Sequence, residues 1–122
     1  MANLNRVEII GNVGKEPEMR FAPSGKPVTS FSVAVNSKFG EKESTEWFSI
    51  VAWEKLAETC NQYLEKGQQV FVEGRLQTRS WEDNDGAKHY KTEVIANKVL
   101  FLGQRKRESE EIKEVDEDDV PF

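Results

Sequence analysis

The sequence has few of the residues that build catalytic or metal centres. It contains one cysteine, Cys60, and one histidine, His89. A single cysteine excludes an intramolecular disulfide and a thiol-rich metal site, and no cluster of cysteines or carboxylates with ligand spacing surrounds the histidine. Without a placed base, the serines and acids do not form a nucleophile system. We therefore expect no enzymatic activity, no bound metal and no cofactor.

Long apolar runs and glycine-rich loops are also missing. No apolar run approaches the roughly 18 residues of a membrane-spanning helix, and no basic start leads into an apolar signal segment. The glycines are scattered, and no glycine-rich loop is followed by a lysine, so nucleotide hydrolysis is not expected. Cys60 lies in a half-apolar, helix-like stretch and is expected to be buried and unreactive. A reducing cytoplasm is the simplest compartment for such a chain.

Charge is unevenly distributed along the 122 residues. The formal net charge is -5, but residues 108–122 hold eight acids and one lysine, a net of -7, which leaves +2 for residues 1–107. A mildly basic body with an acidic arm is typical of nucleic-acid-binding proteins. We expect one domain, residues 1–104, followed by an acidic disordered tail, residues 105–122.

The acidic tail ends on an aromatic residue. Four adjacent carboxylates at positions 116–119 repel any compact arrangement, and the proline that follows has no backbone donor. A phenylalanine on such an arm is an exposed apolar group of the kind that docking peptides offer. A purely solubilising tail is the alternative, but it does not account for the aromatic end. We predict a partner-binding tip made of Asp118, Asp119, Val120, Pro121 and Phe122.

Alternating apolar residues and turn signals predict an all-β chain with one helix. Five strands are expected, at residues 4–13, 28–36, 46–53, 69–81 and 90–102. A helix is expected at residues 55–66, with turns at 16–18 and 23–27, a charged hairpin loop at 37–45 and a hairpin tip at 83–86. A helix between the third and fourth of five strands indicates an OB-fold, a five-stranded Greek-key barrel.

The third expected strand carries apolar groups on both faces. Alternation places Phe48 and Ile50 on one face, and Trp47 and Trp53 on the other. Only one face of the strand can pack against the core, so the apolar groups on the other face must contact another molecule. The two tryptophans are therefore candidates for contact with a ligand or with another subunit.

Trp81 ends the next expected strand, on the face that also presents Arg75 and Arg79. Flat rings beside guanidinium groups give unpaired bases a stacking surface and give phosphates a charged partner. Such stacking contributes roughly 1–3 kcal/mol per base and accepts any base, a general magnitude for single-strand binders of this kind rather than one derived from this chain. Core or subunit-contact roles for the tryptophans are the alternative.

Several motifs occur together and in a fixed order. The most specific are Tyr63-Leu64-Glu65-Lys66-Gly67 and the run from Val72 to Trp81, VEGRLQTRSW; the others are NRVEIIGNVG from Asn5, EPEMR from Glu16, TEW from Thr45 and KLAE from Lys55. With these motifs the chain resembles the bacterial single-stranded DNA-binding proteins of the homotetrameric OB-fold type. The resemblance runs from Asn5 to about Gly103 and resumes at the tip, residues 118–122.

The resemblance implies a homotetramer that binds and protects single-stranded DNA, independently of sequence, in replication, recombination and repair. It implies a protein associated with the nucleoid that recruits partner enzymes through its tip. By similarity, stacking falls on Phe39, Trp47, Trp53 and Trp81, and contacts to the DNA backbone fall on Arg6, Arg20, Lys55, Lys66, Arg75 and Arg79.

Two departures from the family pattern have consequences. Phe39 stands where well-known members carry tryptophan, so weaker stacking is expected there. The acidic link to the tip is only about fifteen residues, which should limit the reach of the tip. For the tetramer itself, the sequence offers apolar side chains beyond the need of a small barrel, such as Phe48 and Val70.

Rival interpretations remain at this stage. An OB-fold module could prefer RNA, because bases stack alike in both nucleic acids and only contacts to the 2′-OH discriminate. The exposed aromatics could instead bury in a partner protein, which would make the chain an adaptor. An OB-fold hydrolase is the third possibility, and the lack of a placed base or metal cluster counts against it.

Overall fold

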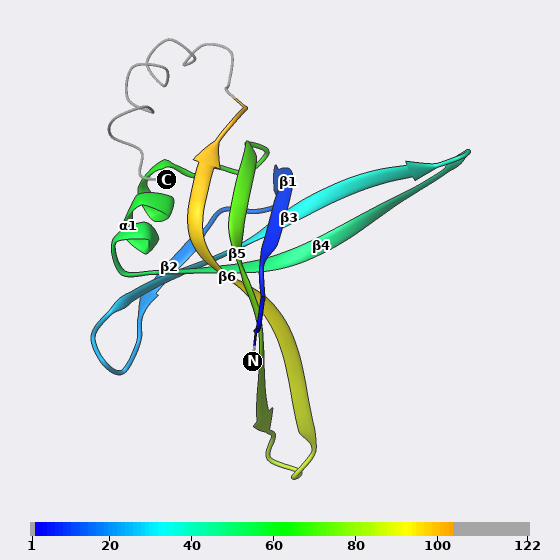
Figure 1. The fold of residues 1–122 in the computed structure, drawn as a ribbon. Coiled ribbons are helices and arrows are strands. Elements are labelled where there is room, and N and C mark those ends of the chain that lie inside the picture. The colour runs from blue at the N-terminus through cyan, green and yellow to red at the C-terminus, as the bar shows by residue number, and fades with distance from the viewer. Residues whose placement is uncertain (1, 104–122) are drawn as a thin grey trace.

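The computed structural model describes residues 2–103, so the predicted tail, residues 105–122, lies outside the described residues. Its elements are β1 (Val7–Val13), β2 (Glu18–Phe21), β3 (Pro27–Phe39), β4 (Lys42–Trp53), α1 (Glu54–Tyr63), β5 (Gln69–Glu82) and β6 (Lys88–Phe101). The strand order is β1-β5-β6-β4-β3-β2, and an additional β1–β3 pairing closes five strands into a barrel. The helix joins the third and fourth strands of this barrel (Figure 1), which confirms the predicted OB-fold.

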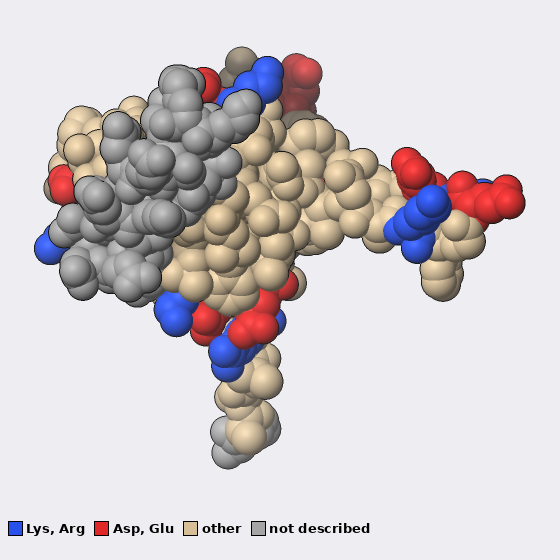
Figure 2. Space-filling view, turned by 90° about the horizontal axis from the view of Figure 1, so that it is seen from above, with Lys and Arg blue, Asp and Glu red and all other residues tan. Residues whose placement is uncertain are grey.

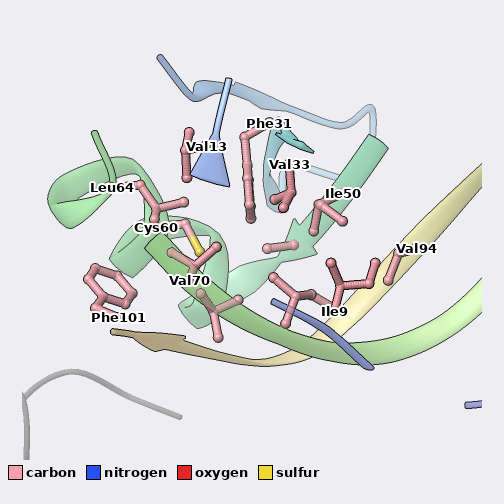
Figure 3. Packing of buried hydrophobic residues seen from close by; sticks show 14 residues of the cluster. Ile9, Val13, Phe31, Val33, Ile50, Cys60, Leu64, Val70, Val94 and Phe101 are labelled. Atoms are coloured by element: carbon pink, nitrogen blue, oxygen red, sulfur yellow. The ribbon is translucent and has the colours of Figure 1, made fainter. Parts of the chain in front are cut away.

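The core lies inside the barrel and forms from the inward residues of alternating strands. Val33, Ile50, Val70 and Val72 are fully buried and pack in one cluster (Figure 3). Val70 therefore does not supply apolar surface for a subunit contact, and the sequence-based assignment of this residue is wrong. Phe48 is partly buried and packs against the same cluster.

Helix α1 covers one end of the barrel (Figure 1). Its Ala57 and Cys60 are buried, and the hydroxyl of Thr29 on β3 donates a buried hydrogen bond of 2.7 Å to the carbonyl oxygen of Ala57. Cys60 is buried, as predicted, and this burial raises the pKa of its thiol to about 12. The described residues contain no helix long and apolar enough to cross a bilayer.

The predicted hairpin loop at residues 37–45 is wrong, because most of it belongs to strands β3 and β4. The two strands stay paired as far as Phe39 and Lys42, and Thr45 donates a 2.7 Å hydrogen bond to Asn36 across the pair. This two-stranded arm projects from the barrel (Figure 1), and its charged side chains gather at its tip (Figure 2). An arm without a core face can be polar throughout, so its sequence lacks the alternation that marks a half-buried strand.

Two further expectations need correction. The sequence predicts no strand between residues 16 and 27, but the four residues of β2 pair with β3 from Glu18 opposite Ser30 to Phe21 opposite Pro27. Alternation along the expected strand 69–81 puts Leu76 on the same face as Val70 and Val72 and so predicts that it is buried, but it is 44% exposed. Strands β5 and β6 shift register at Glu73 and Gly74 and then leave the barrel as a second projecting hairpin (Figure 1). Leu76 lies beyond this shift, so its side chain does not pack into the core.

Candidate nucleic-acid interface

Strand β4 presents two tryptophans on its outer face. Trp47 is 61% exposed and Trp53 is 39% exposed, whereas Ile50 and Ala52 are fully buried. The predicted separation of the two faces is confirmed. Two large apolar rings that stay exposed on a short stretch of sheet indicate a contact surface.

Trp47 lies against the chain that follows β1. A Cβ atom built on Gly14 would lie 2.3 Å from Cζ3 of the Trp47 ring and 2.8 Å from Oγ of Ser32. Gly14 also donates a backbone hydrogen bond of 2.9 Å to the carbonyl oxygen of Ser32. The indole of Trp47 therefore occupies the space that any larger residue at position 14 would need.

A groove that is lined by Trp53 runs over the outer surface of β2, β3 and β4 and the neighbouring face of β5 and β6. It consists of two adjoining hollows of about 390 Å³ each, which share Arg20, Val28, Val51, Arg79 and Glu93. Four basic and two acidic side chains line the groove: Lys15, Arg20, Arg79, Lys91, Glu18 and Glu93. This surplus of positive charge suits a polyanion such as a nucleic-acid backbone.

Strand pairing brings Arg20 to the same face as Trp53. Arg20 on β2 pairs with Val28 on β3, and Val28 pairs with Trp53 on β4. Residues in register across neighbouring strands point to the same side of the sheet. The guanidinium and the indole therefore flank Val28, and all three residues line the groove.

Trp81 and Arg79 form a ring-and-cation pair on β5. The Cζ atom of Arg79 lies 4.9 Å from the centroid of the Trp81 ring, which is a cation–π distance. Arg79 Nε donates a 3.2 Å hydrogen bond to Glu93 on β6, whose side chain is only 12% exposed. Glu93 thus fixes the guanidinium beside an indole that is still 42% exposed.

The remaining predicted residues lie outside the groove. Phe39 is 90% exposed at the tip of the β3–β4 arm. Arg6 pairs instead with Glu8 at 2.9 Å and with Glu73 at 3.2 Å. The predicted residues that do not line the two hollows are Arg6, Lys55, Lys66, Arg75, Phe39, Trp47 and Trp81. The predicted tip, residues 118–122, lies outside the described residues.

Two basic groove residues were missed by sequence reasoning. Lys91 on β6 pairs directly with Arg79 on β5, so it shares the face of Arg79. Counting back from the predicted hairpin tip at residues 83–86 would pair Arg79 with Tyr90 instead, because the strands are joined by five residues, 83–87, and the register is shifted by one. Lys15 follows the glycine bend after β1, and no signal in the sequence indicates that this bend borders the groove.

Comparisons with known proteins show which proteins this chain is similar to. The sequence model of the "Single-strand binding protein family" matches residues 4–102. A protein of Chlorobaculum tepidum named "Single-stranded DNA-binding protein 1" is 48% identical over 108 residues, 84% of this chain and 67% of the relative. A protein of the same name from Xylella fastidiosa is 39% identical over 111 residues, 86% of this chain and 82% of the relative.

A solved structure from Plasmodium falciparum has the same fold. It is described as an "SSB complex with ssDNA", is 32% identical and superposes with a TM-score of 0.76. The similarity covers 84% of this chain and 97% of the other. The shared fold therefore extends over nearly all of the described residues.

Proposed function

The chain belongs to the single-strand binding protein family, and from that premise we propose that it binds single-stranded DNA without sequence preference. We propose further that it protects such DNA on the nucleoid during replication, recombination and repair. The observation that carries this proposal is the placement of exposed indoles and guanidinium groups on one face, with Trp53 and Arg20 lining the same hollow and Arg79 in cation–π contact with Trp81. Rings accept unpaired bases of any kind, while fixed cations accept the phosphates between them.

The contacts divide into two kinds. Bases stack on Trp47, Trp53 and Trp81, and more weakly on Phe39, because its ring is smaller and stands alone at the tip of the arm. Phosphates pair with the cations of the groove, Lys15, Arg20, Arg79 and Lys91. The remaining predicted cations, Arg6, Lys55, Lys66 and Arg75, would serve a strand that continues beyond the groove.

A competition experiment tests this specificity. A fluorescently labelled homothymidine strand is bound to the protein and displaced with unlabelled competitors of equal length. Single-stranded DNA of any sequence should compete, duplex DNA should compete poorly, and matched RNA measures the contribution of the 2′-OH. Equal competition by duplex DNA contradicts the proposal, and stronger competition by RNA favours an RNA-binding module.

A homotetramer is the second part of the proposal, and an apolar row on the outer face supports it. Ile10 on β1, Phe71 on β5 and Leu100 on β6 are in register and point away from the core. Ile10 is 53% exposed, and the other two side chains are half-buried. Covering this row with other copies removes apolar area from water and brings several weak DNA sites together.

Light scattering tests the assembly. The chain has a mass of 14.0 kDa, so a tetramer should scatter as a particle of about 56 kDa at micromolar concentration. Phe71→Glu places a charge in the middle of the row and should lower the mass. Its control, Phe39→Glu, places the same charge on the distant arm tip and should leave the mass unchanged. A stable 14.0 kDa wild-type monomer contradicts this part of the proposal.

Partner recruitment through residues 118–122 is the third part. The ring of Phe122 suits an apolar pocket on a partner, and the carboxylates at 116–119 suit basic side chains around that pocket. Phe122→Ala should abolish capture of replication and repair enzymes in a pull-down from the same cells, while the affinity for DNA changes little. Ile112→Ala, an apolar truncation in the same acidic segment, is the control and should retain the partners.

Deleting residues 114–122 separates the docking role from the charge of the tail. The carboxylates compete with DNA for the groove, so the deletion should tighten single-strand binding slightly at low ionic strength and less at high ionic strength. Phe122→Ala removes no charge and should leave this competition intact. Partners that stay bound to the truncated protein would show that residues 105–122 act only as a solubilising tail beside the binding domain, residues 1–104.

A further inference from the structure

His89 lies on the stacking face of the β5–β6 hairpin, where none of the contacts described above uses it. It pairs with Trp81 across the two strands, and the two rings stack with centroids 5.6 Å apart and planes 21° apart. The imidazole Nε2 lies 2.8 Å from Oδ2 of Asp83. The described residues contain no group of three or more His, Cys, Asp and Glu side chains that could hold a metal ion, so this pair is not part of a metal site.

Asp83 holds His89 in this position from the hairpin tip. Its second oxygen, Oδ1, accepts hydrogen bonds of 2.9 Å from the backbone N–H groups of Asp85 and Ala87. The bond to His89, followed by the backbone bond from Ala87, lowers the pKa of the Asp83 carboxyl. Asp83 therefore stays ionised well below neutral pH.

We propose that His89 is a further DNA-contacting residue, which extends the Trp81 stacking surface and adds a positive charge beside it when protonated. This inference rests on the proposed single-strand binding. The neutral imidazole and the Asp83 carboxylate together carry one negative charge, and the protonated pair carries none. Protonation of the imidazole therefore removes a local repulsion of phosphate, and histidine is the side chain that commonly changes charge near neutral pH.

Three other charged side chains lie near His89 on this face of the hairpin: Arg79, Lys91 and Asp83. Arg79 lies over the same indole from β5, and Lys91 on β6 shares the face of His89 with its Nζ 4.0 Å from Glu93. Asp83 is the acid in contact with the imidazole. Arg79 and Lys91 are the basic side chains on this face, and their attraction for phosphate does not depend on His89. The imidazole side chain is 46% exposed and can reach a strand that stacks on Trp81.

The test compares wild type, His89→Phe and His89→Gln at pH 8.0 and pH 5.5 at constant ionic strength, using the full chain. His89→Phe keeps a flat ring without a titrating charge, and His89→Gln removes the ring. Fluorescence anisotropy of a labelled homothymidine strand gives the affinity. Wild type should bind about two- to fivefold more tightly at pH 5.5 than at pH 8.0, after the pH effect measured for His89→Phe is subtracted. This is the range expected of one exposed charge pair.

Two further results are expected. The log–log salt slope of wild type should steepen by up to about 0.7 on going to pH 5.5, one phosphate's contribution, and that of His89→Phe should not. At pH 8.0, His89→Gln should bind less tightly than His89→Phe, because only the latter keeps a ring beside Trp81. Lys88→Gln, a charge change on the opposite face of the same hairpin, is the control and should keep the wild-type pH response.

The outcomes separate this inference from the proposed function. Equal pH responses in wild type and His89→Phe overturn the role of His89, while single-strand binding itself stands. Failure of all variants and of wild type to bind the strand at either pH overturns the proposed function instead. Circular dichroism of each variant at both pH values confirms that the compared proteins are folded.

Discussion

Replacing Trp47 and Trp81 together by alanine should weaken single-strand binding by between about 30-fold and about 10⁴-fold. In the proposed function each ring stacks a base, which is worth roughly 1–3 kcal/mol in such proteins generally, so loss of the pair should cost about 2–6 kcal/mol. The two rings lie on different strands, so we treat them as independent positions, and losses at independent positions add approximately. Anisotropy of a labelled homothymidine strand measures the change.

Tyr90→Ala is the matched control for this pair. Tyr90 is an exposed aromatic residue, but it neighbours His89 on β6 and therefore points to the face of the hairpin opposite Trp81. Its removal should change the affinity less than about twofold, well within the range of an ordinary surface substitution. A double tryptophan variant that binds within about tenfold of wild type would show that stacking on these rings does not drive binding.

Gly11→Ala should lower the free energy of unfolding by about 3 kcal/mol, at the upper end of the range for overpacked interiors. A Cβ atom at Gly11 would lie 2.3 Å from the backbone oxygen of Ala34 and 2.7 Å from Cγ1 of Val33. Both obstacles belong to β3, where its pairing with β1 closes the barrel. Relief of the clash must separate these strands. Urea denaturation followed by circular dichroism measures the loss.

Gly14→Ala is the matched comparison, because its obstacles are side chains rather than backbone. The added methyl group meets the ring of Trp47 and the hydroxyl of Ser32, and both can rotate away. Stability should therefore fall by less than about 1 kcal/mol, while binding should weaken because the Trp47 ring is displaced. If Gly11→Ala kept the wild-type stability while Gly14→Ala unfolded, this would contradict the conclusion that the barrel closes only because position 11 has no side chain.

Alternation along the chain was sufficient to predict the barrel and its exposed indoles. Strand β4 shows why: Ile50 and Ala52 must be buried together, which leaves Trp47 and Trp53 on the other face whatever the neighbouring strands are. The position of the helix then selects the OB-fold among small β-rich folds. These predictions depend on local periodicity, which the sequence carries directly.

The parts that could not be predicted depend on pairing between distant segments. Strand β2 is short and exposed, so only its pairing with β3 defines it, and this pairing places Arg20 beside the groove. The register shift at Gly74 follows from close strand contact, since a Cβ atom there would lie 2.2 Å from the carbonyl oxygen of Ile95. Lys15 likewise reaches the groove only because β1 closes the barrel against β3.

A tryptophan fluorescence titration with a long homothymidine strand at two salt concentrations tests the central claim most directly. All three tryptophans of the chain belong to the proposed stacking set, so stacked bases should quench a large part of the emission. The log–log salt slope should lie between about -1.4 and about -2.8 per subunit, for two to four phosphates neutralised in the groove. Unchanged emission on addition of the strand, together with equal affinity for a duplex of the same length, would contradict the account.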